Sequence, residues 1–275
     1  MTQSDIDSSE SGYSKKLGRF AIPLYAINRD DLSIRGSGFI IKIEDDHYLV
    51  TAKHVFDQNW QPGGVFISSE PNKFHPALGA QMHTGKSLTI EKDDQADISV
   101  VHLASDIPKP PYILAGDNSK EAGHSVAIDE TVSALCVQPR AGCEYAVVGY
   151  PLSKNKITHA RRYIQHNGYC HSDLSPESAV YKRLGLDEDK NILVKFDRKT
   201  GTGNLGNGVI FPEPLGMSGG PIFQIFRNPE NSTDFKFSIA GILTSREPKD
   251  GLLQGTDISR VFQMIHKLRL RGRRK

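Results

Sequence analysis

The stretch Gly216-Met217-Ser218-Gly219-Gly220-Pro221 places one serine among three glycines, directly before an apolar run that begins at Ile222. A serine hydroxyl becomes a nucleophile when a base takes its proton, and the anion that then forms on the substrate needs hydrogen-bond donors. Glycines permit the tight turn that directs successive backbone N–H groups to one place. The stretch therefore predicts a nucleophile turn leading into a strand, although an inert Gly-Ser turn has the same letters.

Two further polar residues lie beside apolar strands. His54 follows a strand expected at residues 47–51, and Asp97 precedes one expected at 98–104. Taken singly, each is most simply a rim or turn residue. Together with Ser218 they supply a base, an orienting acid and a nucleophile, in the chain order His, Asp, Ser.

Most of the chain is expected to be β-structure. Segments rich in β-branched and aromatic residues and bounded by Gly, Pro, Asn and Asp lie at 19–27, 36–43, 47–51, 88–91, 98–104, 144–150, 192–196, 222–226 and 235–244. A further strand is an option at 157–170. Helices are expected at 53–57 and at 258–270, the latter behind a cap at Asp257, and residues 176–184 are compatible with a third. Many strands with one C-terminal helix predict barrels or a sandwich.

The sequence resembles the chymotrypsin-like serine peptidases at residues 51–55 (Thr-Ala-Lys-His-Val), 96–100 (Ala-Asp-Ile-Ser-Val) and 216–221. Residues 36–39 (Gly-Ser-Gly-Phe) and 149–151 (Gly-Tyr-Pro) look like bacterial members of the same group. The resemblance covers about residues 18 to 265. It implies an all-β fold of two antiparallel β-barrels with a C-terminal α-helix.

This resemblance implies an organisation of four parts. A disordered N-terminus is expected at 1–17, and a first barrel at 18–115 carries His54 and Asp97. A second barrel at 116–256 carries Ser218, and a helix with a basic tail follows at 257–275. The Pro-rich segment 107–112 is the expected linker between the barrels.

The resemblance also implies the chemistry of a serine endopeptidase. Ser218 Oγ would attack a peptide carbonyl, His54 would accept its proton and pass it to the leaving amine, and Asp97 would orient the imidazole. The backbone N–H groups of Gly216 and Ser218 would form the oxyanion hole. A protein or peptide substrate is expected, and neither a metal nor an organic cofactor is needed.

Two features depart from the family. Met217 stands where the secreted, zymogen-activated members carry an aspartate that pairs with a newly cut N-terminus. Activation by N-terminal trimming is therefore not expected, and the oxyanion loop must be ordered by other contacts, by a partner or by the substrate.

The second departure concerns the substrate-binding residues. The resemblance places Glu213, Thr244, Ser245 and Arg246 at the specificity pocket, with Pro212 where a trypsin-like aspartate would stand. Glu213 would attract a basic side chain and Arg246 an acidic one, so the preferred residue before the cut does not follow from the sequence.

Two other functions fit parts of the sequence. A catalytically silent member of the fold would serve as a peptide- or partner-binding module. The serine stretch also matches the G-x-S-x-G elbow of α/β-hydrolase esterases, with Asp250 or Asp257 and His266 as partners, but that elbow leads into a helix. The apolar letters after residue 220 favour a strand.

Composition limits the setting. No apolar run is long enough to span a bilayer, so no membrane role is expected. The polar first sixteen residues lack the pattern of a secretory signal, and three cysteines are no disulfide framework, so a cytoplasmic protein is expected. Nucleic acid is not an expected partner except through the basic tail, whose simpler reading is a solvated helix end. The tail residues are Lys267, Arg269, Arg271, Arg273, Arg274 and Lys275.

Overall fold

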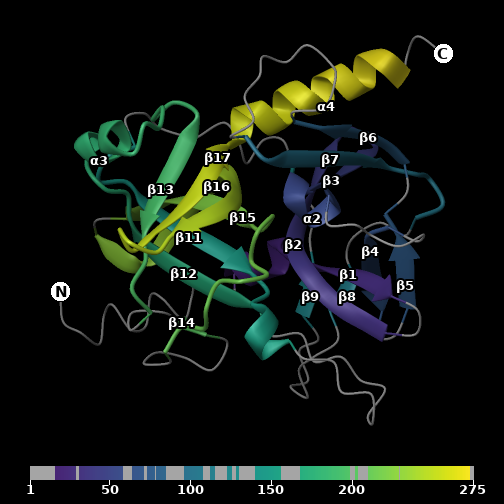
Figure 1. Cartoon of the computed structure of the whole chain (residues 1–275), viewed down its shortest axis with the longest axis horizontal. Coiled ribbons are helices and arrows are strands. Elements are labelled where there is room, and N and C mark those ends of the chain that lie inside the picture. Colours follow the sequence, from purple (N-terminus) through teal and green to yellow (C-terminus); the bar gives the residue numbers. More distant parts are fainter. Residues whose placement is uncertain are drawn as a thin grey trace.

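The computed structural model shows two curled β-sheets beside each other, which form the first and the second half of the molecule. One long helix starts at the second half and runs over the first (Figure 1). It describes residues 16–28, 31–57, 64–70, 73–77, 79–84, 96–107, 112–114, 123–125, 128–129, 140–155, 168–198, 202–203, 210–228 and 230–272. Within these ranges no helix is long and apolar enough to cross a membrane.

The first sheet has eight strands in the order β5-β4-β1-β2-β3-β7-β6, with β10 beside β2. Its strands are β1 (Ile22–Asn28), β2 (Asp31–Ile43), β3 (Asp46–Ala52), β4 (Phe66–Glu70), β5 (Lys73–Pro76), β6 (Gly79–His83), β7 (Ile98–Leu103) and β10 (Ile128–Asp129). The short helices η1 (Gly18–Phe20) and α2 (Lys53–Asp57) accompany it, and β8 (Tyr112–Leu114) pairs with β9 (Gly123–Ser125) as a separate hairpin. All pairs in the sheet are antiparallel except β10 with β2.

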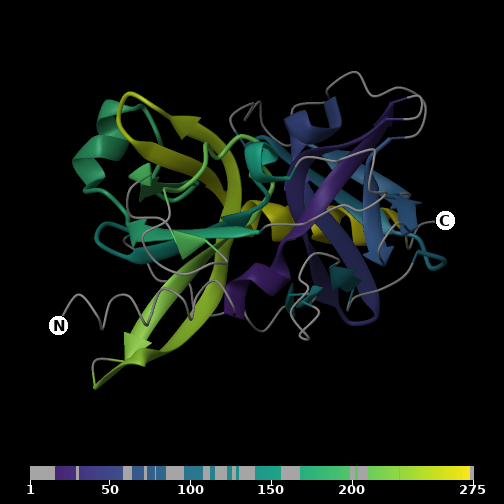
Figure 2. The same cartoon turned by 90° about the horizontal axis from the view of Figure 1, so that it is seen from below.

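The second sheet has seven strands in the order β13-β17-β16-β15-β11-β12-β14. They are β11 (Glu144–Gly149), β12 (Tyr169–Leu174), β13 (Asn191–Lys195), β14 (Thr202–Gly203), β15 (Pro221–Asn228), β16 (Asn231–Glu247) and β17 (Leu252–Asp257). The helices η3 (Leu152–Lys154), α3 (Ser178–Arg183) and α4 (Ile258–Gly272) complete this half. Strands β15 and β16 form a long hairpin that reaches beyond the rest of the sheet (Figure 2).

The apolar side chains divide into a core within each half and a third core between the halves. In β3, Leu49 packs inside the first half, whereas Tyr48 and Val50 belong to the cluster between the halves, as the alternation of side chains along a strand requires. Helix α4 adds residues at helical spacing to that central cluster: Ile258, Val261, Met264, Ile265 and Leu268. The two halves are therefore packed against one shared hydrophobic core.

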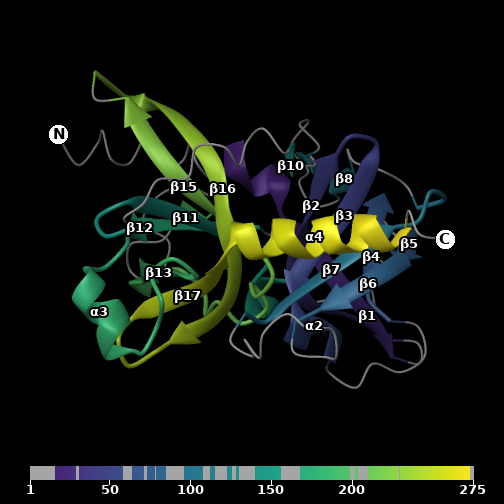
Figure 3. The same ribbon diagram turned by 90° about the horizontal axis from the view of Figure 1, so that it is seen from above.

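Helix α4 starts in the second half and lies over the first (Figure 3). The carboxylate of Asp257 accepts the Ser259 N–H at 2.8 Å, which is the predicted N-cap, and also pairs with the fully buried guanidinium of Arg140. Near the other end, Arg269 pairs with Glu44 at 2.5 Å and lies 3.9 Å from Asp46. One cation of the predicted basic tail is thus engaged with the first half.

The all-β fold with a C-terminal helix is confirmed. Helices expected at 53–57 and 258–270 appear as α2 and α4, and part of 176–184 appears as α3. The strand expected at 88–91 and most of 157–170 lie outside the described residues. The α/β-hydrolase alternative is wrong, because the antiparallel strand β15 and not a helix follows Ser218.

The four-part division stays a prediction. Strand β10 lies in the range expected for the second barrel and yet pairs with β2 of the first sheet through Ile128↔Ile41. Several short strands were not predicted from the sequence, namely β4, β5, β6, β8, β9, β10, β14 and β17.

Candidate active site

His54 and Asp97 lie at neighbouring ends of two paired strands. Ala52, the last residue of β3, faces Ile98, the first of β7, so the segments just outside these strands meet at one sheet edge. The His54 N–H donates to Asp97 Oδ1 at 3.0 Å, and His54 Nδ1 lies 2.6 Å from Asp97 Oδ2. An ionised carboxylate only accepts, so Nδ1 carries the proton and Nε2 keeps a lone pair available as a base.

The backbone at Ala96 and Asp97 is held by hydrogen bonds from both halves of the molecule. Asp97 has a φ of 43°, a left-handed conformation that aspartate tolerates better than most residues. Its carbonyl accepts the Lys53 N–H at 2.9 Å, within the first half. From β17 of the second half, the buried hydroxyl of Thr256 donates to the Ala96 carbonyl at 2.7 Å. The orientation of the carboxylate therefore depends on the packing of one half against the other.

Ser218 lies in a turn that is pressed against the same region. Its carbonyl accepts the Ser37 N–H at 2.9 Å, and the next residue, Gly219, donates its N–H to Leu243 at 2.7 Å. A Cβ on Gly219 would lie 2.1 Å from Thr51 Oγ1, and its φ is 89°. Only glycine fits there. The turn is thus seated beside the end of β3, the strand that leads to His54.

Ser218 is partly exposed to solvent. Among the described residues, no hydrogen bond joins its hydroxyl to the His54 ring. Such bonds are often long before substrate binds. The structure thus brings the predicted acid and base into direct contact and seats the predicted nucleophile beside the same sheet edge.

The hydrogen bonding of the neighbouring peptide shows in which direction the Gly216 N–H points. The Leu215 carbonyl accepts the Leu152 N–H at 2.8 Å. In a trans peptide the carbonyl and the following N–H point to opposite sides. The Gly216 N–H is therefore directed away from Leu152.

The same reasoning applies to the peptide that enters Ser218. The Met217 carbonyl accepts the Gly220 N–H at 2.9 Å, so the Ser218 N–H points away from this turn. Within the described chain, the N–H groups of Met217 and Gly219 have backbone acceptors, whereas those of Gly216 and Ser218 have none. These two are the groups that the sequence predicted for an oxyanion hole.

Met217 itself is fully buried in the core of the second half. Its neighbours there include Val147, Phe211 and Ile222. A Cβ on Gly149 would come within 2.9 Å of Met217 Cβ, so the strand β11 approaches the loop closely at that glycine. An apolar side chain therefore anchors the loop from inside the second half.

The charged residues predicted for the specificity pocket are paired with each other. Glu213 pairs with Arg246 and, at 2.8 Å, with Arg198, which the sequence did not single out. The Arg246 guanidinium also lies 5.2 Å from the centre of the Phe196 ring. Glu213 and Arg246, whose opposite charges gave conflicting predictions of specificity, thus belong to one cluster of two cations and one anion.

The two uncharged residues of that set differ in their surroundings. Thr244 is buried and donates its hydroxyl to the Gln254 carbonyl at 3.2 Å, whereas Ser245 is exposed. Of these two residues, only Ser245 is therefore open to solvent. Leu215, beside the loop, is 71% exposed and was not named from the sequence. Its only sequence signal was its place directly before Gly216.

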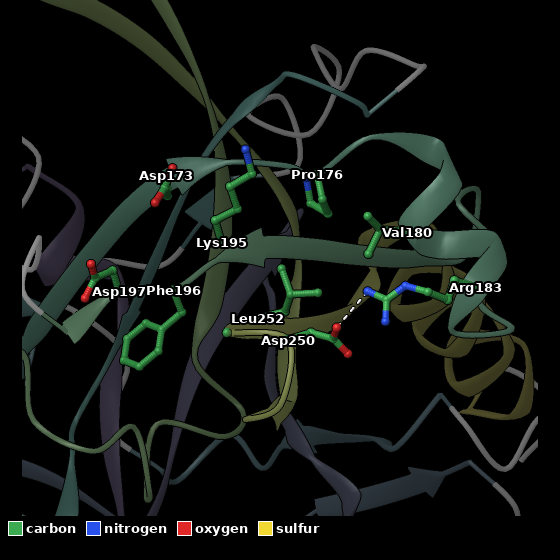
Figure 4. A pocket seen from close by; sticks show the side chains of 10 residues that line it. Asp173, Pro176, Val180, Arg183, Lys195, Phe196, Asp197, Asp250 and Leu252 are labelled. Carbon is green, nitrogen blue, oxygen red and sulfur yellow. Dashed lines mark hydrogen bonds and ion pairs between the residues drawn. The ribbon is translucent and has the colours of Figure 1, made fainter.

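An open pocket with a volume of about 410 Å³ lies between α3 and the ends of β13 and β17 (Figure 4). Val180, Phe196 and Leu252 give it apolar walls, and Arg183 pairs with Asp250 at its rim at 2.7 Å. His54, Asp97 and Ser218 are not among its lining residues. The pocket is therefore distinct from the candidate catalytic residues.

A buried histidine of β12 contacts two of the residues that line this pocket, Lys195 and Phe196. His171 Nε2 donates to the Lys195 carbonyl at 2.8 Å, and its ring meets Phe196 and Phe211 edge to face. Burial lowers the pKa of His171, so the ring is held neutral. In the described part of the chain, His171 and Cys170 belong to no cluster of metal-binding groups.

Two curled antiparallel sheets, a helix at the C-terminal end and a shared core define the trypsin-like double-barrel fold. The chain is similar to a solved structure described as "Structure of GrC", with a TM-score of 0.51, and the match covers 91% of this chain and 93% of that chain. The two are 14% identical, a level at which the likeness shows the fold alone. No model of a known family and no curated protein matches the sequence.

Proposed function

We propose that this protein is a serine endopeptidase that acts through His54, Asp97 and Ser218. The observation that carries the proposal is the double contact between His54 and Asp97, with Nδ1 2.6 Å from Oδ2 and the backbone N–H 3.0 Å from Oδ1. This contact fixes both the tautomer and the direction of the ring, which is what a general base requires.

The chemistry proceeds in two halves. His54 Nε2 takes the proton of Ser218 as Oγ bonds to the substrate carbonyl carbon, and the new imidazolium then protonates the leaving amine as the peptide C–N bond breaks. Water next attacks the acyl-enzyme, with His54 again accepting and returning a proton. The N–H groups of Gly216 and Ser218 stabilise the oxyanion in both halves.

The proposal needs no cofactor, and its substrate is a protein or peptide. The residue before the scissile bond is proposed to contact the cluster formed by Glu213 and Arg246 with Arg198. Because two guanidinium groups share one carboxylate, that cluster has a net positive charge.

A fluorophosphonate probe tests the proposal, because it phosphonylates only an activated serine. Wild-type protein should be labelled, Ser218→Ala should not, and Ser178→Ala should be labelled like wild type. Ser178 is a suitable control because it is partly exposed, as Ser218 is, but lies in α3. His54→Ala should slow both labelling and cleavage of a peptide library at least about a thousandfold. Cleavage that persists in purified Ser218→Ala would refute the assignment.

A catalytically silent binding module is the second candidate. It is favoured by one observation: within the described chain the Ser218 hydroxyl forms no hydrogen bond with His54. In that case wild-type protein would neither react with the probe nor cleave the library, and it would retain a peptide from the library equally well with and without Ser218.

A further inference from the structure

Ser37 is a fully buried serine of β2 whose hydroxyl and backbone N–H join the first half to the second. Its hydroxyl donates to the Gly216 carbonyl at 2.9 Å and accepts the Tyr150 N–H at 2.8 Å. Its own N–H donates to the Ser218 carbonyl at 2.9 Å, and its carbonyl accepts the Thr51 hydroxyl at 2.7 Å.

These contacts reach the residues on both sides of Met217. The residue that most needs such a contact is Gly216, because it has a φ of 92° and no side chain to restrict its rotation. The Gly216 N–H and the Gly216 carbonyl belong to two adjacent peptides that are joined through the rotatable bonds of Gly216. The hydrogen bond from Ser37 fixes the direction of one peptide, and the hydrogen bond from Leu152 fixes the other. The Ser37 hydroxyl is the described group that holds this carbonyl.

The space around the hydroxyl is as restricted as its bonding. A Cβ on Gly149 would lie 3.0 Å from Ser37 Oγ, and one on Gly36 would lie 2.7 Å from the Val55 side chain. A side chain longer than serine therefore does not fit at position 37 without moving the strands around it.

We infer that Ser37 is a positioning residue, which fixes the Gly216 peptide so that the N–H groups of Gly216 and Ser218 face the same oxyanion. This inference rests on the proposed function. It assigns to the first half of the molecule the ordering of a loop that belongs to the second half. Met217 supplies no charge for an ion pair, and the Ser37 hydroxyl provides the anchor as a neutral hydrogen bond.

The experiment compares Ser37→Ala with wild type and with Ser175→Ala. Ser175 is a matched control, because it is also buried and its hydroxyl is hydrogen-bonded, to Tyr181 at 2.9 Å, in a part of the second half away from Ser218. All three proteins are assayed at a temperature at which circular dichroism shows each to be folded. The readouts are kcat and KM on a cleaved peptide, the rate of fluorophosphonate labelling, and deuterium uptake of the peptide covering residues 213–220.

Ser37→Ala should lower kcat about tenfold to a hundredfold with little change in KM, which is less than the loss on removing an oxyanion donor outright. Labelling should slow by a similar factor, and deuterium uptake at 213–220 should rise. Ser175→Ala should match wild type in all three. Equal losses in both variants, or a kcat in Ser37→Ala within twofold of wild type, would overturn the inference.

The two proposals fail in different ways. If wild-type protein neither cleaves nor labels, the peptidase proposal fails, and deuterium uptake alone decides the role of Ser37. Unchanged uptake at 213–220 in Ser37→Ala would then show that Ser37 does not order the loop.

Discussion

Replacing Met217 tests how the oxyanion loop is held from inside the second half. The side chain is fully buried among apolar neighbours. Met217→Ala deletes three heavy atoms, worth about 2.4 kcal/mol at ~0.8 kcal/mol for each buried methylene-sized group. Incomplete collapse of the resulting cavity raises the expected loss to about 2–5 kcal/mol. Urea unfolding followed by circular dichroism measures this loss directly.

Two further substitutions at Met217 refine the result. Met217→Leu conserves volume and should lose less than about 1.5 kcal/mol. Met217→Asp places a carboxyl group in the same apolar site without a described cation beside it, and it should be at least as destabilising as alanine. If Met217→Asp unfolds at the same urea concentration as Met217→Leu, the side chain is not enclosed as described and the apolar anchor of the loop is refuted.

Three other predictions concern single residues. Gly219→Ala should abolish fluorophosphonate labelling, because its Cβ would overlap Thr51 Oγ1; normal labelling would show that the turn is not pressed against β3. Thr256→Val should lower kcat several-fold and Thr256→Ser should restore it, because the hydroxyl holds the Ala96 carbonyl beside Asp97; equal rates for the two would refute this role. The pKa of His171 is lowered from 6.5 by burial, so the unfolded chain takes up the proton first as the pH falls. The contribution of His171 to the free energy of unfolding should thus be present in full above pH 6.5. Below pH 6.5 it should decrease by at most ~1.4 kcal/mol per pH unit, until the pH reaches the pKa of His171 in the folded protein. In His171→Gln, urea unfolding at pH 8, 6.5 and 5 should show a smaller decrease, and an identical pH profile would contradict the assignment.

The sequence predicted the fold through its longest patterns. The strand before His54 and the helix after Asp257 contain apolar residues at clear spacing, and both elements lie where they were expected. Short strands such as β4 and β5 are set by pairing with β1 and with each other, and too few residues are involved to give a periodic signal. The parallel pairing of β10 with β2 joins segments far apart in the chain, so no local pattern indicates it.

The sequence predicted those residues of the candidate site whose side chains have a distinctive chemistry and lie beside a strand. His54, Asp97 and Ser218 each lie beside a recognisable strand, and their chain order identifies them as a set. Residues that act through hydrogen bonds to the backbone leave no such trace. Thr256 looks like an ordinary strand residue in the sequence, and the Gly-Ser-Gly-Phe stretch at 36–39 does not indicate a role for Ser37, because the partners of both hydroxyls include carbonyl groups that every residue possesses.

The pairing of Glu213 with Arg198 and Arg246 illustrates the same limit for charged groups. Arg198 lies just after β13, Glu213 in the loop before Ser218, and Arg246 near the end of β16. Three segments must fold together before the charges meet. The sequence therefore shows the charges but not which of them cancel.

Helix α4 links the two halves of the molecule that carry the proposed catalytic residues. His54 and Asp97 belong to the first half and Ser218 to the second, while α4 leaves the second half at Asp257 and its Arg269 is paired with Glu44 of the first. Fifteen residues of helix give a rod of about 22 Å, fixed at one end to each barrel. The helix therefore joins the half that carries the proposed base to the half that carries the proposed nucleophile, in addition to the hydrogen bonds of Ser37 and Thr256 between the halves.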